Sequence, residues 1–408
     1  MSQTLQHKEI TTEISAEISE ALKNNSAKVL VISESTFNPE IIRSLSDGLK
    51  QNSSLAELDL LHITIPSMVE TILLEDLLNS LNTPHLTLEG IQDPSTTDLN
   101  KKIFQSLKSS TTLRTLLIRN MPLVLEDIHA LFSAIKDNNS IESFILSTGT
   151  QINQKGAEIL REILQTKKNI TTLNLINNSI TDQICQYIAE GLKNNQTLRS
   201  LDLSENQISA GGIIAICNSL KTNWSLKNLV LCDNPGFSFP ALTALKDMLA
   251  SNTTIRRLWI SNCYQPREEN EVDLICSGLK LNESLTFVDI YSSDIPDDYY
   301  TYIKFNSALE NVLEVNYSLR NIQQYRNNDT IQQNLKRNQN LQAEMLHKIA
   351  ILVHNIARSK EAIGGLPNEL WLEIFSLVRH PGLDPVVNSV NLFHKIQSGL
   401  IVRVTGSH

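Results

Sequence analysis

Leu192-Lys-Asn-Asn-Gln-Thr-Leu198-Arg-Ser-Leu201-Asp-Leu203-Ser-Glu-Asn206 is the stretch of sequence that decides the fold. Its pattern, Leu-Lys-x-Asn followed by a short spacer and Leu-x-x-Leu-x-Leu, recurs along the chain. We call the middle apolar residue of each copy the marker: Leu30, Leu58, Leu86, Leu116, Phe144, Leu173, Leu201, Leu229, Leu258, Val288 and a weaker Ile322. Successive markers lie 28 to 30 residues apart, except the last pair, which is separated by 34. Such regular spacing indicates an internal repeat.

Each repeat divides into two structural halves. The Leu-x-Leu alternation has a period of two and predicts a short strand, whereas the dozen residues that follow have helical spacing. In residues 182–193, for example, Ile184, Ile188 and Leu192 fall on one helical face. An asparagine in the turn after the strand can bond backbone groups that the turn leaves unpaired. These turn asparagines are Asn178, Asn206, Asn234 and Asn262.

A strand-helix unit of this size cannot bury its apolar face alone, so the copies must stack. Stacking places parallel strands on one side and helices on the other, and the wider helices bend the stack so that the sheet is concave. The pattern resembles the ribonuclease-inhibitor class of leucine-rich repeats over roughly residues 1–325. The resemblance implies an α/β horseshoe with a concave parallel sheet, convex helices and helical caps. Proteins of that class include inhibitors, immune receptors, GTPase activators and bacterial effectors.

The pattern also predicts the domain boundaries. We expect an N-terminal helical cap at 1–25, because Ile10, Ile14, Ile18 and Leu22 mark one helical face. About ten or eleven repeats fill 26–329, and a helical cap at 330–360 closes the array. A small helical segment at 361–408 follows the Gly364-Gly365 pair.

Residues beside each marker point away from the core of a parallel sheet, so they form the concave face. Early repeats place small and charged residues there, and middle repeats place small polar ones. Late repeats place aromatic and charged residues on or beside this face: Arg257, Trp259, Tyr264, Phe287, Asp289 and Tyr291. Aromatic and arginine side chains are the usual anchors of protein interfaces, so we predict a partner-binding patch at 257–291. Packing of the same rings against the C-terminal segment is the alternative.

The segment Leu366-Pro-Asn-Glu-Leu370-Trp-Leu-Glu-Ile374-Phe375 resembles the opening of an F-box over about 366–395. F-boxes dock on the Skp adaptor of cullin ubiquitin ligases. The resemblance therefore implies adaptor contacts at Leu366, Pro367, Leu370, Ile374 and Phe375. A helical cap with no adaptor is the alternative. Repeats followed by a C-terminal box are similar to the repeat effectors of intracellular bacteria.

Composition and motifs disfavour several classes of partner and several kinds of chemistry. A formal net charge of −9 disfavours nucleic acid and anionic membranes as general partners. Five cysteines without a CxxC pair indicate free thiols in a reducing compartment. We find no signal peptide, no run long enough to span a membrane and no enzyme signature. His347 and His354 lack further ligands for a metal. The sequence therefore predicts neither catalysis nor a cofactor or metal.

These observations favour a cytoplasmic protein-interaction scaffold. It would hold a protein target on its concave face and recruit a host ubiquitin ligase through its C-terminal segment. As an effector it would be secreted into the host cytoplasm. Two alternatives remain open: a binding protein or inhibitor whose tail is purely structural, and a GTPase-activating protein.

Overall fold

The computed structural model describes residues 3–92, 98–263, 269–290, 299–323 and 329–341. The chain forms two compact units, Met1–Phe237 and Ser238–His408. Strands and helices alternate along the described residues of both units. This arrangement confirms the predicted α/β repeat architecture, in which helices back a parallel sheet.

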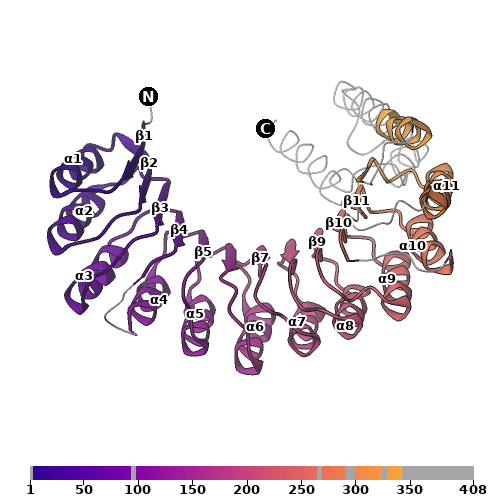
Figure 1. Cartoon of the computed structure of the whole chain (residues 1–408), viewed down its shortest axis with the longest axis horizontal. Coiled ribbons are helices and arrows are strands. Elements are labelled where there is room, and N and C mark those ends of the chain that lie inside the picture. Colours follow the sequence, from indigo (N-terminus) through magenta and orange to yellow (C-terminus); the bar gives the residue numbers. More distant parts are fainter. Residues whose placement is uncertain (1–2, 93–97, 264–268, 291–298, 324–328, 342–408) are drawn as a thin grey trace, which may run out of the picture. The chain divides into compact units, whose positions relative to one another are not determined.

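The first unit contains nine strands and eight helices among its described residues. In chain order they are β1 (Gln3–Lys8), α1 (Thr12–Lys23), β2 (Ala27–Ser33), α2 (Pro39–Gln51), β3 (Glu57–Leu61), α3 (Met68–Asn79), β4 (His85–Glu89), α4 (Leu99–Ser109), β5 (Thr115–Arg119), α5 (Leu125–Asp137), β6 (Ser143–Ser147), α6 (Gln154–Thr166), β7 (Thr172–Asn174), α7 (Asp182–Asn194), β8 (Ser200–Asp202), α8 (Ala210–Leu220) and β9 (Asn228–Val230). Within this unit the strands line the inner side of an arc and the helices form its outer side (Figure 1).

The markers set the register of the sheet. In the first unit each strand pairs in parallel with the next, and the marker of one strand lies beside the marker of its neighbour, as Leu30 does with Leu58 and Leu201 with Leu229. In these strands every marker is at most 1% exposed. One repeated apolar position therefore forms a continuous buried ridge, as the spacing predicts.

Strand β1 lies ahead of the first predicted marker and was missed by the leucine pattern. It pairs in parallel with β2, with Leu5 beside Leu30. Helix α1 follows it, buries Ile18 and Leu22, and exposes Glu13, Glu17 and Glu20. The first strand-helix pair therefore joins the sheet and presents a charged helical face.

The second unit repeats the same design. It contains α9 (Phe239–Ser251), β10 (Arg257–Trp259), α10 (Glu269–Leu281), β11 (Phe287–Asp289), α11 (Tyr299–Val315) and β12 (Asn321–Gln323). Strands β10 to β12 are parallel, with Leu258, Val288 and Ile322 side by side. Ile322 is thus a true marker despite its longer spacing. Residues 329–341 are helical, and the rest of the predicted cap at 330–360 lies outside the described residues.

A buried asparagine near the end of most helices joins consecutive repeats. The Asn223 amide group donates to the carbonyls of Leu192 and Asn195 in the preceding repeat, at 2.7 and 3.0 Å. Its Oδ1 accepts from the backbone N–H groups of Ser225 and Leu226. Equivalent bonds are made by Asn52, Asn138, Asn195, Asn282 and Asn316. This asparagine belongs to the Leu-Lys-x-Asn phrase, so the repeated motif has a direct structural cause.

A second set of asparagines lies in the turns after β7, β8 and β9, as the sequence predicts for three of its four positions. The amides of Asn178, Asn206 and Asn234 each donate to a carbonyl of the preceding repeat, at 2.8 to 3.0 Å. The fourth asparagine, Asn262, also lies in a turn but not at the equivalent position: it is exposed with a φ of 53°, and the buried Cys263 occupies the site that asparagine fills in the other three turns. The motif is shifted by one residue there.

The turn asparagines also coincide with a change in strand length. Strands β3 to β6 have five residues, whereas β7 to β9 have three. The turn position holds the buried, apolar Ile63, Ile91 and Met121 after β3, β4 and β5, and the exposed Gly149 after β6. Strand β10 is equally short although the buried Cys263 holds this position, so the asparagine accompanies the short strands without being required for them.

Lys167 interrupts the series of helix-end asparagines. Its ammonium group donates to the Asn138 carbonyl at 2.7 Å and to Asn139 Oδ1 at 2.8 Å. Burial lowers the pKa of this ammonium group. A lysine supplies the donor half of the asparagine's role but has no acceptor for the loop N–H groups.

We predict that Asn195→Ala lowers the free energy of unfolding by about 2–4 kcal/mol, because it leaves buried backbone donors and acceptors without hydrogen-bond partners. The matched control is Asn194→Ala, since Asn194 is exposed at the end of α7 and should change stability by less than about 0.5 kcal/mol. Urea unfolding followed by circular dichroism measures both values. Equal effects of the two substitutions would contradict the role given to the buried amide.

We predict that Lys167→Asn raises the free energy of unfolding by about 1 kcal/mol, because an amide at this position restores the missing acceptor. The control is Lys168→Asn, which removes the same charge from an exposed neighbour. A rise in thermal midpoint is expected only for the first variant. A lower thermal midpoint for Lys167→Asn would show that the lysine contacts stabilise the fold more than an asparagine does.

Candidate functional site

The strand face of the second unit carries the predicted partner-binding patch. Strands β10 and β11 pair so that Arg257 lies beside Phe287 and Trp259 beside Asp289. Because side chains alternate along a strand, these four residues share the face opposite the buried Leu258 and Val288. Two cross-strand pairs thus form the corners of a small four-sided patch.

Two aromatic rings lie along one diagonal of this patch. The ring centroids of Trp259 and Phe287 are 4.9 Å apart, and their planes are tilted by 44°. Both side chains are half-buried. Aromatic pairs at this separation gain energy beyond their buried area, so each ring holds the other in place and leaves part of its surface open to solvent.

Two opposite charges occupy the other corners but do not pair. Arg257 is exposed, and no hydrogen bond or ion pair is recorded for its guanidinium group among the described residues. The sequence placed Asp289 among the presented residues, whereas the structure buries it to 6% exposure. Its carboxylate accepts a hydrogen bond from Ser261 Oγ at 3.2 Å. The aromatic diagonal separates the cation from the carboxylate, because Trp259 and Phe287 lie between them.

Ser261 was missed by sequence reasoning. It stands three residues after the marker Leu258, a position predicted to face outward, yet it is 9% exposed and bonded to Asp289. Trp259 rather than Ser261 is the register partner of Asp289, so the pairing of the strands gave no direct signal for this bond. Ser204 is buried at the equivalent position, where its hydroxyl donates to Asp202 at 2.7 Å.

The remaining predicted site residues lie outside the described residues. Tyr264 and Tyr291, expected at the concave patch, belong to this group. So do the five adaptor-contact candidates: Leu366, Pro367, Leu370, Ile374 and Phe375. The structure therefore brings together Arg257, Trp259, Phe287 and Asp289 of the predicted set.

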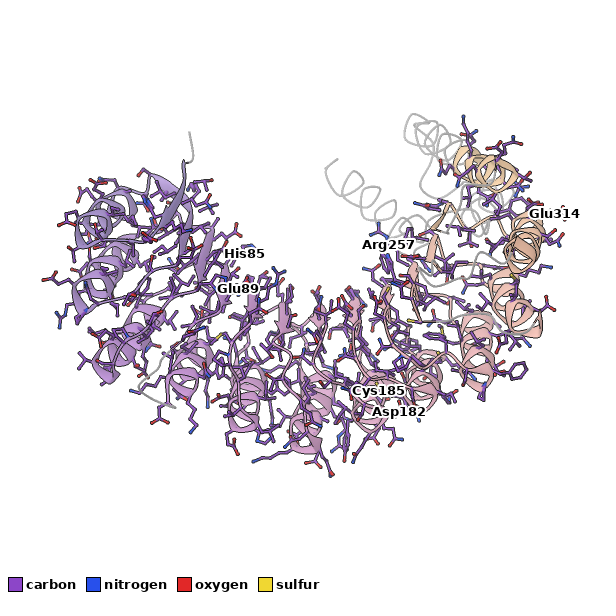
Figure 2. All side chains as sticks on the ribbon, in the orientation of Figure 1. His85, Glu89, Asp182, Cys185, Arg257 and Glu314 are labelled. Carbon is purple, nitrogen blue, oxygen red and sulfur yellow. The ribbon has the colours of Figure 1, made fainter. Side chains whose placement is uncertain are left out.

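The strand face of the first unit has a different chemistry. His85 and Glu89 project from β4 on the inner side of the ribbon (Figure 2). Glu89 accepts a hydrogen bond from the Asn120 amide at 3.0 Å, and further along Asn174 donates to Asp202 at 3.0 Å. These polar side chains satisfy one another, so they provide fewer open contacts than the late patch.

Three buried cysteines have thiols that are shielded from solvent. Burial raises the pKa of the thiols of Cys217 and Cys276 to about 12 and shifts that of Cys185 in the same direction. Thiols held this firmly in the protonated form are poor nucleophiles. In the described part of the chain, His, Cys, Asp and Glu side chains nowhere gather in a group of three suited to a metal ion. None of the described helices has the length and apolar character needed to cross a bilayer.

Comparisons with known proteins give one family model and several solved structures to which the chain is similar. Residues 194–217 match the leucine-rich-repeat family model. The fold is similar to a structure of leiomodin-1 actin-binding site 2, at 18% identity and a TM-score of 0.29, over 45% of this chain and 90% of that one. It is also similar to the crystal structure of the yeast Rad7–Elc1 complex, at 13% identity and a TM-score of 0.46, over 78% of this chain and 75% of that one. A comparison with the curated proteins gives no match.

Proposed function

We propose that this chain is a protein-binding scaffold without a catalytic step of its own, and that a protein target binds the strand face of the second unit. The observation that carries the proposal is the Trp259–Phe287 ring pair beside the exposed Arg257. Tryptophan and arginine are enriched among the residues that dominate binding energy at protein interfaces. A rigid parallel sheet holds these side chains, so little conformational freedom is lost when a partner binds.

The second half of the proposal concerns the C-terminal segment. Its Leu-Pro-x-Glu-Leu phrase, with Ile374 and Phe375 following, supports docking on the Skp adaptor of a cullin ubiquitin ligase. The chain would then act as an effector adaptor of an intracellular bacterium, secreted into the host cytoplasm. It would present its bound target to the host ligase. A tail that serves only as a structural cap is the competing outcome.

The target half is tested by substituting Trp259. We expect proteins captured from a eukaryotic lysate by the full chain to be lost on Trp259→Ala, because the ring supplies apolar contact area. Mass spectrometry identifies them, and a melting curve confirms that the variant folds. The matched control is Trp224→Ala, which removes a 67% exposed tryptophan from a loop of the first unit. Capture that depends on Trp224 rather than Trp259 would refute this site.

The adaptor half is tested with the purified Skp adaptor. We expect the full chain to bind it and Leu370→Lys to weaken binding more than tenfold, since a charge would enter an apolar contact. Leu281→Lys is the control, because Leu281 is 59% exposed at the end of α10. Calorimetry measures both variants. Absence of binding by the unmodified chain removes the ligase role, and aggregation after deletion of 361–408 would identify the tail as a structural cap.

A further inference from the structure

We propose that the patch formed by Arg257, Trp259, Phe287 and Asp289 recognises an acidic protein segment in which a large apolar residue neighbours a carboxylate. This inference rests on the proposed function, and it specifies the partner's chemistry at the same site.

The first argument is that the Arg257 guanidinium has no counter-charge among the described residues. Asp289 is the carboxylate closest along the strands, but it accepts from Ser261 and is 6% exposed. The ring pair occupies the diagonal between Asp289 and Arg257. The two rings lie between Arg257 and Asp289, so these two charged groups do not meet across the patch. The Arg257 guanidinium therefore remains available to an outside anion.

The second argument is the distribution of charge within the second unit. The described residues of β10 to β12, with the residue directly before each strand, carry three arginines and one carboxylate. These are Arg256, Arg257, Arg320 and Asp289. Helices α9 to α11 carry three basic and six acidic residues, namely Lys246, Lys280, Lys304, Asp247, Glu269, Glu271, Asp273, Glu310 and Glu314, and the helical residues 329–341 add Lys336, Arg337 and Asp329. Figure 2 shows Arg257 on the strand side of this unit and Glu314 on its helix side. Arg257 is the one of these arginines at an outward-facing strand position, whereas Arg256 and Arg320 stand two residues before their markers and add positive charge where the strands begin, in a chain of net charge −9.

The third argument is that Arg256 is fixed in place by the fold. Its guanidinium donates to the carbonyls of Thr253 and Ser284, at 3.1 and 3.0 Å. Arg114 and Arg199 make the same bond to a serine carbonyl of the following repeat in the first unit. Arg256 thus contributes positive potential from a fixed position, while its exposed neighbour Arg257 can contact a ligand directly.

The geometry limits what the partner segment looks like. Residues two apart on a strand lie roughly 7 Å apart, which separates Arg257 from Trp259. A carboxylate on Arg257 and an apolar side chain on the rings must therefore come from neighbouring positions of one segment. The open ring surface accepts an aliphatic or aromatic side chain, and it also excludes water from the ion pair, which strengthens the charge interaction.

Fluorescence anisotropy with the full chain tests the proposal. The probe is a labelled peptide, acetyl-Glu-Glu-Leu-Glu-Glu-Phe-Glu-Glu-amide, compared with versions in which glutamine or phosphoserine replaces glutamate. We expect the acidic peptide to bind at least tenfold more tightly than the glutamine version. We expect Arg257→Gln to weaken its binding about five- to tenfold, and 0.5 M salt to reduce the affinity as well.

The matched control is Arg119→Gln, which removes the same charge from an exposed strand-end arginine of the first unit. Unchanged affinity in this variant supports a local contact, whereas an equal loss in both variants would reveal a general charge effect and overturn the proposal. Equal binding of the glutamine peptide, preference for the phosphoserine peptide alone, or no binding would also overturn it. If protein capture still requires Trp259 in those cases, the proposed function stands and only the acidic partner is rejected.

Discussion

The side-chain amide of the helix-end asparagine is the interaction on which the repeat depends. Where each helix stops, backbone carbonyls of one repeat and N–H groups of the next loop are buried together, and both need partners. An asparagine amide supplies donors and an acceptor at fixed spacing, and Asn223 and Asn282 use both halves. Lys167 supplies only donors, and Ser80 and Ser110 place a hydroxyl at the same position, so the repeat tolerates other side chains between the asparagines. Apolar spacing drives stacking and sets the sheet register, and these amides bond the buried backbone groups where one repeat meets the next.

Leucine spacing predicted the sheet register because every marker occupies the same buried position in its strand. A one-residue slip would turn the marker out of the core, so Leu258, Val288 and Ile322 must align even where the spacing lengthens to 34. The same reasoning missed β1, because Gln6-His7-Lys8 lacks the second leucine of the pattern. It also misplaced the last turn asparagine. Whether Asn262 or Cys263 takes the buried turn position depends on backbone φ, which the amino-acid sequence does not show.

At the candidate site, alternation along the strand predicted that Arg257, Trp259 and Phe287 leave the core. It could not predict the burial of Asp289, since that depends on how side chains of adjacent strands cover one another. The 4.9 Å ring contact joins diagonal rather than facing positions, and rotamers rather than register decide such contacts. Sequence periodicity thus identified the members of the patch, whereas its internal order became visible only when the strands were placed side by side.

The two strand faces show how one backbone can support different surfaces. Residues beside the markers contribute little to stacking, so their chemistry varies without loss of the fold. In the first unit they often satisfy one another, as in the Asn174–Asp202 and Asn120–Glu89 pairs, and such pairs reduce the gain from an outside partner. In the second unit the rings keep Arg257 and Asp289 apart, and the carboxylate bonds Ser261 instead. Arg257 therefore keeps an exposed guanidinium that makes no such internal pair among the described residues, unlike the polar side chains of the first unit.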